Sequence, residues 1–583
     1  MFRFLADKEV RASLAAHRPR LIFAGAAMVG RGLLGLAAPF FMGKSVDVIV
    51  DRADQSDLIR YIAFLVAFAA STAVCQWWMR WLWIGWSRQT EQRVRDGLLG
   101  HLVALPLGFF HRSRVGDLMS RLTSDVEAVR MGYGPGVMHC VHPLVMTSGA
   151  VTLMVTTSPM LTLTAMAPMV ALFFVMKSIL PTIHLRALRV QERQAELSTR
   201  AQESFSGSRV VKAFAREAHE ERRFRELSEG FLQDSLAHAR RRGLFHCLIE
   251  IFGGLGSLVL FVAAGHMIID GSLTIGDYVA FTGYLSQLIW PMIALGWTLA
   301  LFKRAEAAGE RIAEIDAEQA EAGQVEVTGP APSFRGEVAL HDLTFSYPGS
   351  ATPALKHIDV HVPVGCTLGI VGPTASGKTT LINLLLRLHD PPEGSVTIDG
   401  QDIRSLPVQH VRAAFAVAPQ ESFLFSQSIR ENIAFGHEDA TPSEAHVALE
   451  RAGLDSDIAS FPDGAETLVG ERGVTLSGGQ RQRAAIARAL VKAAPVLVLD
   501  DALSAVDTET EQRILARLKP VLAERTAIIV SHRLSAVQSA DEILVLDAGR
   551  IIERGDHRTL MAAHGAYARL WRLQQEEEEL EQL

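Results

Sequence analysis

The chain has 583 residues, of which 49% are hydrophobic and 21% are charged, and its formal net charge is −7. This mildly negative balance argues against nucleic-acid binding, which needs clustered positive charge. The four cysteines show neither Cys-x-x-Cys nor Cys/His spacing, so we expect neither a disulfide framework nor a zinc site. High apolar content beside ordinary charge instead predicts an apolar part joined to a soluble part.

The first 20 residues are charged and lack the short apolar core and the small-residue cleavage site of a secretory signal. We expect residues 1–20 to form an amphipathic segment on the inner surface of a membrane. Its basic residues are Lys8, Arg11, Arg18 and Arg20.

Residues 21–312 predict a transmembrane domain. A helix that spans a membrane needs about 20 mostly apolar residues, and six stretches meet this length. The two long loops between them, Ser87–Gly134 and Pro181–Gly243, are polar. We expect each long loop to continue its spans as a helical hairpin about 35 Å deep, at about 1.5 Å per residue. The six stretches are Leu21–Met42, Tyr61–Trp86, Pro135–Ser158, Met160–Leu180, Leu244–Ile269 and Ile275–Phe302.

Arginine and lysine residues gather at the span ends that carry the long loops. The positive-inside rule makes that side cytoplasmic. Six spans return the chain to the side on which it began, so we expect both termini and the soluble part to lie in the cytoplasm.

Five polar residues interrupt the apolar stretches: Arg31, His139, His142, His246 and Glu250. Charge inside a membrane is costly and usually faces a cavity or a partner. His246 and Glu250 are four residues apart and therefore share one helix face. Two interpretations stay open, a polar wall of a cavity or structural groups that are paired or hydrated near the interface. If Glu250 faces a cavity, its negative charge would favour lipophilic cations.

Residues 313–335 are polar, contain Gly and Pro, and predict a linker. Residues 336–583 alternate between strand and helix patterns, which predicts an α/β domain. The first strands are expected at Val338–Tyr347, His357–Val362 and Thr367–Val371.

A Gly-rich loop follows the third of these strands and precedes a helix expected over Thr380–Leu388. It reads Gly-Pro-Thr-Ala-Ser-Gly-Lys-Thr from Gly372 to Thr379, which fits the P-loop pattern. Backbone N–H groups at the helix start would cradle phosphates. Lys378 would reach the β- and γ-phosphates, and Thr379 would ligate Mg²⁺.

Two further segments complete a nucleotide site. Val496–Asp500 predicts a buried strand that ends in an acid, which can place Asp500 beside the metal as a Walker B aspartate. Leu476–Gln480 reads Leu-Ser-Gly-Gly-Gln and precedes a helix expected over Arg481–Val491, which would make a second phosphate-binding helix start.

Together these motifs resemble the ABC transporter superfamily, and specifically the bacterial multidrug-type exporter half-transporters. The resemblance covers nearly the whole chain. It implies a six-helix membrane domain of the exporter type followed by an α/β P-loop ATPase domain, with ATP and Mg²⁺ as cofactors. It further implies ATP-driven export of hydrophobic or amphipathic compounds, drug-like or lipid-like, by alternating access from a multi-pass position in the bacterial inner membrane.

The resemblance also assigns roles to single residues. Tyr347 would stack on adenine, Gln420 would sense Mg²⁺ and the membrane domain, Asp507 matches the D-loop, and His532 matches the switch histidine that contacts the γ-phosphate. Nucleotide contacts are implied for Gly372, Thr374, Ser376, Gly377, Lys378, Thr379 and Thr380, and for the signature residues Ser477, Gly478, Gly479 and Gln480. Metal contacts are implied for Thr379, Gln420 and Asp500. Gly470–Gly473 matches an exporter-specific loop, and Phe109–Arg121 and Glu203–Phe214 match two coupling loops.

The sequence departs from this family at Asp501. The family has glutamate there as the base that polarises the attacking water, and aspartate is shorter by one C–C bond, roughly 1.5 Å. A misplacement near 1 Å can lower a rate by about 100-fold. The open alternative is that Asp501 still works through a water molecule or a slight backbone shift.

This departure predicts a heterodimer. In the family each ATP lies between the P-loop of one ATPase domain and the signature motif of the other. A partner chain with a Walker B glutamate would then perform most hydrolysis, and the P-loop site of this chain would hold ATP longer. The alternatives are a homodimeric exporter with a slow aspartate-based ATPase, a regulatory membrane ATPase, and an exporter-fold importer of a metal chelate.

Overall fold

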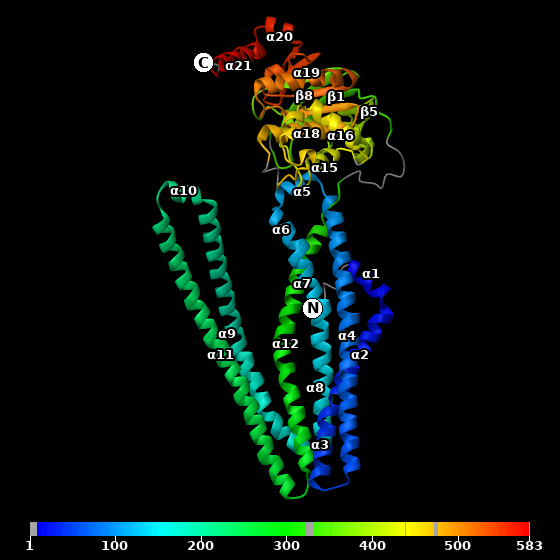
Figure 1. Ribbon diagram of the computed structural model, residues 1–583, viewed down its shortest axis with the longest axis vertical. Coiled ribbons are helices and arrows are strands. Elements are labelled where there is room, and N and C mark those ends of the chain that lie inside the picture. Colours follow the sequence, from blue (N-terminus) through cyan, green and yellow to red (C-terminus); the bar gives the residue numbers. More distant parts are fainter. Residues whose placement is uncertain (1–7, 322–331, 351, 438, 471–475, 582–583) are drawn as a thin grey trace. The chain divides into compact units, whose positions relative to one another are not determined.

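The computed structural model describes residues 8–321, 332–350, 352–437, 439–470 and 476–581. The chain forms two compact units. The first comprises Met1–Leu102 and Val115–Glu318 and is helical, and the second comprises Val103–Arg114 and Gln319–Leu583 and contains all the described strands (Figure 1). The predicted fold class, membrane helices followed by an α/β domain, is thereby confirmed. The domain boundaries at residues 20, 312 and 335 stay predictions, since residues 322–331 lie outside the described part of the chain.

Among the described residues, six helical segments of the first unit are long and apolar enough to cross a membrane, as predicted. Helices satisfy their backbone hydrogen bonds internally, which is what a lipid environment requires. Most continue well beyond the apolar stretches that predicted them. The helices of this unit are α1 (Lys8–Ala16), α2 (Arg18–Gly35), α3 (Ala37–Val50), α4 (Gln55–Val103), α6 (Val115–Ser120), α7 (Val126–Met131), α8 (Val137–Thr157), α9 (Pro159–Ser206), α10 (Ser208–Ala213), α11 (Glu217–Ile269) and α12 (Ile275–Asp316).

Two of the spans are not continuous α-helices. The first span is interrupted at Leu36, which lies between α2 and α3 and caps both helices. The third span contains two π-helical turns, Arg121–Asp125 and Gly132–Gly136, and the second of them includes Pro135. Proline removes a backbone donor, so the helix widens at this point.

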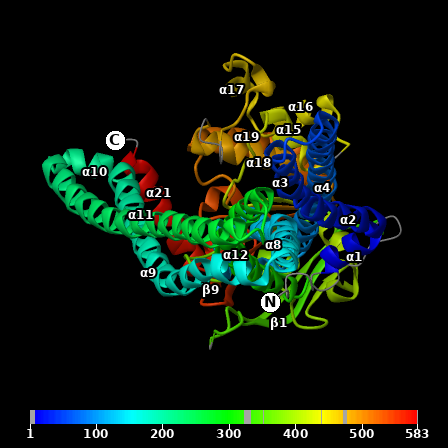
Figure 2. The ribbon, with the colours of Figure 1, turned by 90° about the horizontal axis from the view of Figure 1, so that it is seen from below.

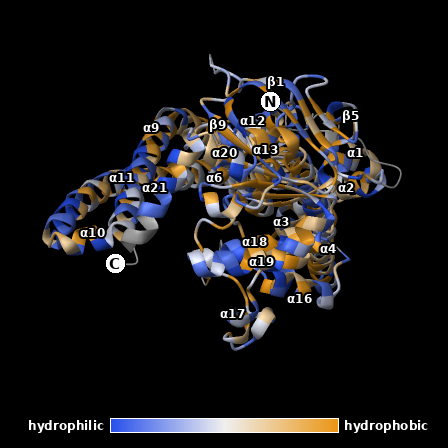
Figure 3. Ribbon diagram, turned by 90° about the horizontal axis from the view of Figure 1, so that it is seen from above, coloured by the Kyte–Doolittle hydropathy of each residue, from blue (hydrophilic) through white to orange (hydrophobic). Residues whose placement is uncertain are grey.

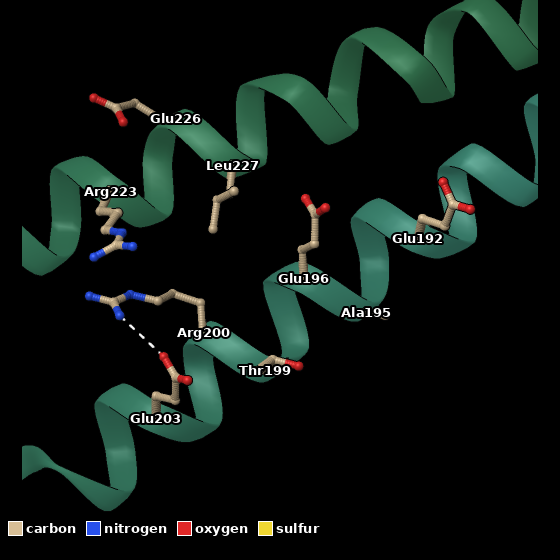
Figure 4. Close-up of a pocket in the computed structure, with 9 residues that line it drawn as sticks. All are labelled: Glu192, Ala195, Glu196, Thr199, Arg200, Glu203, Arg223, Glu226 and Leu227. Atoms are coloured by element: carbon tan, nitrogen blue, oxygen red, sulfur yellow. Dashed lines mark hydrogen bonds and ion pairs between the residues drawn. The ribbon is translucent and has the colours of Figure 1, made fainter.

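The long helices α9 and α11 run side by side and are joined by the short helix α10, as the sequence predicted for the second long loop (Figures 1 and 2). Hydrophilic residues prevail on α9 and α11 toward α10, where hydrophobic residues also occur (Figure 3). Ion pairs join the two helices there, Arg200 with Glu220 and Arg193 with Asp234, the second at 3.3 Å. The groove between the helices therefore contains acidic and basic side chains together, and Arg200 also binds Glu203 at 3.2 Å (Figure 4).

The second unit contains two sheets. One is antiparallel in the order β2-β1-β4-β5, and the other has the order β10-β9-β3-β8-β7-β6 and is parallel except for β10. The strands are β1 (Val338–Phe345), β2 (Leu355–Val362), β3 (Thr367–Val371), β4 (Val396–Ile398), β5 (Gln401–Asp402), β6 (Phe415–Ala418), β7 (Val496–Asp500), β8 (Thr526–Val530), β9 (Glu542–Asp547) and β10 (Arg550–Gly555).

Hydrophobic cores cover the parallel sheet on both faces, so its central strands are apolar throughout. In β7, Leu497 and Leu499 enter one core and Val496 and Val498 the other, as the alternation of a strand requires. The helices of this unit are α5 (Leu107–Arg112), α13 (Lys378–Leu385), α14 (Val408–Ala413), α15 (Ile429–Ala434), α16 (Pro442–Arg451), α17 (Asp455–Ala459), α18 (Gly478–Val491), α19 (Thr508–Glu524), α20 (His557–Ala562) and α21 (Ala566–Glu581).

Several predicted bounds were wrong by a few residues. Helix α13 begins at Lys378 rather than Thr380 and ends at Leu385 rather than Leu388. Helix α18 begins at Gly478 rather than Arg481, because Ser477 caps it and so brings both signature glycines into the helix.

Candidate nucleotide site

Four neighbouring parallel strands end at one edge of the larger sheet, and their carboxyl ends hold the predicted site. The P-loop follows β3, His532 follows β8, Asp500 ends β7, and Gln420 follows β6. Ligands of open α/β sheets bind at this edge. A pocket of about 330 Å³ lies here, lined by Tyr347, Ala354, Thr374, Ala375, Ser376, Gly377, Lys378, Thr379, Thr380, Gln420, Asp500, Asp501, Val530 and His532.

Two glycines allow the P-loop backbone to turn tightly. Gly377 has φ +107°, and a Cβ there would lie 2.7 Å from Leu355 Cδ2. A Cβ at Gly372 would lie 2.1 Å from the Leu546 carbonyl oxygen, so no other residue fits without a backbone shift. The turn delivers the chain to the start of α13, where unpaired backbone N–H groups suit phosphate oxygens.

Lys378 lies inside this loop. Its side-chain nitrogen donates to the carbonyl oxygens of Gly372 at 2.9 Å and Pro373 at 2.8 Å. Burial lowers the pKa of Lys378, and the nearby Asp501 and Asp500 carboxylates oppose that shift. The ammonium group is thus held at the loop by weak carbonyl contacts that phosphate oxygens can replace.

Tyr347 also lines the pocket. Its hydroxyl donates to the Thr380 hydroxyl at 3.0 Å, and its ring packs edge-on against Phe345 and His389, each with a centroid distance of 5.2 Å. The ring is therefore fixed beside the P-loop helix, in a position suited to stacking on a base.

Asp500 and Thr379 supply the oxygen ligands that Mg²⁺ prefers. Asp500 is 5% exposed, and burial, with a smaller effect of Asp501, raises its pKa to about 6, while Lys378 lowers it. No group of three or more His, Cys, Asp or Glu side chains suited to a metal occurs among the described residues. A divalent cation here would accordingly be held by Asp500, Thr379 and phosphate oxygens, which is the usual arrangement for Mg²⁺.

Asp501 has a strained backbone. Its φ is +49°, in the left-handed region that aspartate tolerates better than most residues. Its carbonyl oxygen accepts from the Ser504 hydroxyl at 2.9 Å and from Gln482 Nε2 at 3.4 Å. Its carboxylate accepts from the backbone N–H of His532 at 3.3 Å. The short carboxylate is therefore drawn toward the β8 end of the pocket.

The signature residues Ser477, Gly478, Gly479 and Gln480 do not line this pocket. Ser477 and Gln480 form a capping box at the start of α18, and Gln480 Nε2 donates to Asp457 at 2.9 Å. Asp507 is also outside the pocket, where it caps α19, and the hydrogen bonds from Thr510 lower its pKa. Glu471, Arg472 and Gly473 of the predicted exporter-specific loop lie outside the described residues.

Outside the P-loop, the sequence interpretation missed three residues of this region. Ala354 and Val530 line the pocket, and Gln482 holds the Asp501 and Ser504 segment. Val530 lies two residues before His532 at the end of a buried strand, which was a usable signal. Ala354 and Gln482 come close only through the tertiary fold and carried no signal of their own.

Comparison with known proteins gives concordant results. Residues 21–292 match the family model of the ABC transporter transmembrane region, and residues 355–504 match that of the ABC transporter. The probable multidrug resistance ABC transporter ATP-binding/permease protein YheI of Bacillus subtilis (strain 168) is 36% identical over 92% of each chain. The multidrug resistance-like ATP-binding protein MdlA of Escherichia coli (strain K12) is 36% identical over 96% of this chain and 95% of its own length. The solved structure of a bacterial Atm1-family ABC exporter with ATP bound has a TM-score of 0.76 and 28% identity, and covers 96% of this chain and 99% of its own.

Proposed function

Because this chain belongs to the ABC transporters, with a transmembrane region and an ATP-binding domain in one polypeptide, we propose that it is one half of a two-chain exporter. Exporters of this type couple ATP hydrolysis to transport across a membrane. The proposal is that this half binds ATP and hydrolyses it slowly, while a different half-transporter performs most hydrolysis.

The observation that carries this proposal is the Asp500–Asp501 pair at the end of β7. Lys378, Thr379 and Asp500 line one pocket with Tyr347, as an ATP site requires. Asp501 occupies the position of the water-polarising base, but its carboxylate is short and accepts from the His532 backbone N–H at 3.3 Å. Both features hold it back from a water beside the γ-phosphate, so the site suits binding better than hydrolysis.

The chemistry in this proposal is the attack of water on the γ-phosphate, which depends mainly on positioning and charge stabilisation. Lys378 stabilises charge on the transferred group, His532 contacts the γ-phosphate, and Asp501 orients the water. Thr379 and Asp500 would hold Mg²⁺, which supplies charge neutralisation between the β- and γ-phosphates when bound, and Gln420 lies beside them. The signature residues of this chain would complete the site of the partner, which agrees with their position outside this pocket.

The membrane half supports export of apolar or amphipathic compounds. Its six candidate spans bring mostly apolar side chains to the bilayer. The named drug-resistance roles of the two bacterial relatives favour the same substrate class. The proposed setting is the inner membrane, with the ATP-binding domain and both termini in the cytoplasm, where the basic span ends lie.

The test compares this chain alone with the chain purified together with its candidate partner. The pair is expected to hydrolyse ATP at least tenfold faster, and the substrate should stimulate only the pair. Fast, transport-coupled hydrolysis by this chain alone would contradict the two-chain proposal and favour the homodimer. Transport assays in inside-out vesicles distinguish export, which appears as uptake, from import of a metal chelate.

A further inference from the structure

Four basic side chains from three membrane helices form a cluster that the sequence did not identify. Arg31 lies on α2, Arg80 on α4, and His139 and His142 on α8. The charge of Arg80 acts on both Arg31 and His139, and that of Arg31 acts on both histidines. A Cβ at Gly32, the neighbour of Arg31, would lie 3.6 Å from His142 Nδ1, so α2 and α8 are in close contact here.

No carboxylate balances this cluster in the described part of the chain. Arg31 Nε and His142 Nδ1 are buried without a hydrogen-bond partner. Residues 21–46, 58–90, 128–191 and 278–305 contain no Asp or Glu at all. The apolar stretches contain two acids, Asp277 in the capping box at the start of α12 and Glu250, which is exposed on α11 and forms no ion pair among the described residues. Among the described residues, the positive charge is therefore uncompensated.

The uncompensated positive charge lies deep in the membrane. Arg31 lies ten residues beyond Leu21, or about 15 Å along a helix. The hydrocarbon core is about 30 Å thick, so Arg31 lies near its middle. Ionisable residues at this depth are costly and face a cavity or a ligand. An anion that enters the cluster would supply the missing charge.

Aromatic and apolar surface adjoins the cluster on two sides. The His139 ring lies 4.9 Å from the Trp297 ring and 6.1 Å from that of Trp290, and both indoles are exposed in the single chain. An apolar groove of about 620 Å³ runs along α2, α3 and α8, between residues such as Leu33 and Val145. Leu33 follows Arg31 by two residues and Val145 follows His142 by three, so the groove begins within one helical turn of the charges.

We propose that this cluster binds the anionic group of an amphipathic substrate, a carboxylate, sulfate or phosphate, while the adjoining groove holds its apolar body. Arginine binds such groups through two parallel hydrogen bonds, which gives both strength and orientation. This inference rests on the proposed export function and names its substrate class. It differs from the cation preference that Glu250 alone suggested, because the two arginines carry more charge than one exposed carboxylate.

The first test is binding of three matched probes to the assembled transporter in phosphatidylcholine nanodiscs. The probes are 11-(dansylamino)undecanoic acid, its methyl ester, and an amine of the same chain length. The acid is expected to bind at least tenfold more tightly than the ester or the amine. Equal affinities for all three probes would overturn the proposal.

The second test asks whether tight binding of the acid depends on the cluster, by using variants of its arginines. Arg31→Gln and Arg80→Gln should each weaken binding of the acid at least tenfold and leave the ester unchanged, while Arg31→Lys should retain most of the affinity. Arg60→Gln is the matched control, because Arg60 lies 20 residues before Arg80, near the start of α4, is exposed, and pairs with Asp57 at 3.2 Å. Arg80 is exposed, so its variant is expected to fold even if Arg31→Gln does not. Unchanged, tight binding of the acid in Arg80→Gln, or an equal loss of affinity in Arg31→Gln and Arg31→Lys with both variants folded, would contradict the assignment.

Two further experiments distinguish a lipid from a soluble source of the anion, and a failure of the anion preference from a failure of the export function. If a membrane lipid supplies the anion, phosphatidylglycerol in the nanodisc should stimulate ATP hydrolysis and compete with the acid, and Arg31→Gln should lose both effects. If a soluble compound supplies the anion, the acid should stimulate ATP hydrolysis and phosphatidylglycerol should not. ATP-driven transport of the ester or the amine without preference for the acid would overturn this inference alone. Hydrolysis of ATP without transport of any probe would overturn the export function itself.

Discussion

The nucleotide pocket and the membrane cluster hold their charges in different ways. In the pocket, Lys378 lies beside the carboxylates of Asp500 and Asp501, so both signs are present before any ligand binds. In the membrane half, Arg31 and Arg80 lie near two histidines and no carboxylate. A nucleotide with its metal ion brings negative phosphates and a positive cation, so its site needs protein charges of both signs. A site whose charges are all positive suits a negatively charged ligand.

The largest expected effect comes from removing the only lysine of the pocket. Lys378→Ala should lower ATP hydrolysis at this site about 100- to 1,000-fold, as the loss of one charge-stabilising donor usually does. The measurement is steady-state phosphate release by the assembled transporter, with single-turnover release to isolate this site. Lys519→Ala, on the exposed face of α19, is the control and should leave the rate unchanged.

The second prediction concerns the charge balance of the pocket without nucleotide or divalent cation. Burial raises the pKa of Asp500 to about 6, so the folded state disfavours the charged form. The resulting loss of stability is absent below about pH 4, grows as the pH rises, and is complete above about pH 6. Asp500→Asn should therefore stabilise the ATP-binding domain by up to about 3 kcal/mol at pH 8, and by almost nothing at pH 4.

Thermal unfolding in detergent at both pH values checks this prediction. An equal change in the unfolding midpoint at pH 4 and pH 8 would mean that the effect is not electrostatic. The same variant should lose ATP hydrolysis, because the neutral amide is a poor ligand for Mg²⁺.

The third prediction sharpens the role of Asp501. Asp501→Glu in the assembled pair should raise hydrolysis at this site about tenfold or more, because the carboxylate gains reach toward the water. Asp556→Glu, at the exposed cap of α20, is a matched control that should not change the rate. A rate for Asp501→Glu at or below that of the unchanged chain would show that length is not what limits this site.

The smallest effect is expected at Glu250. It is exposed on α11 and forms no ion pair among the described residues. Glu250→Gln should alter binding of the undecanoic acid probe by less than twofold. A tenfold gain in affinity would place Glu250 beside the cluster. The cluster would then contain charges of both signs, as the nucleotide pocket does.

Local sequence patterns predicted the parts that depend on local physics. Span lengths follow from apolar runs, and the P-loop follows from glycine spacing before a helix, so both were found. The left-handed backbone of Asp501 depends on Gln482 and Ser504, which hold its carbonyl oxygen, and no pattern encodes that contact. Likewise, Arg31 and Arg80 are 49 residues apart in sequence, and only helix packing brings their charges together.

The most direct test of this account is ATP-dependent uptake of the dansyl acid into inside-out proteoliposomes that contain the assembled transporter. We expect uptake that requires ATP, exceeds that of the matched amine, and is lost in Lys378→Ala. Uptake that persists in Lys378→Ala, or intact ATP hydrolysis without uptake of any probe, would contradict it.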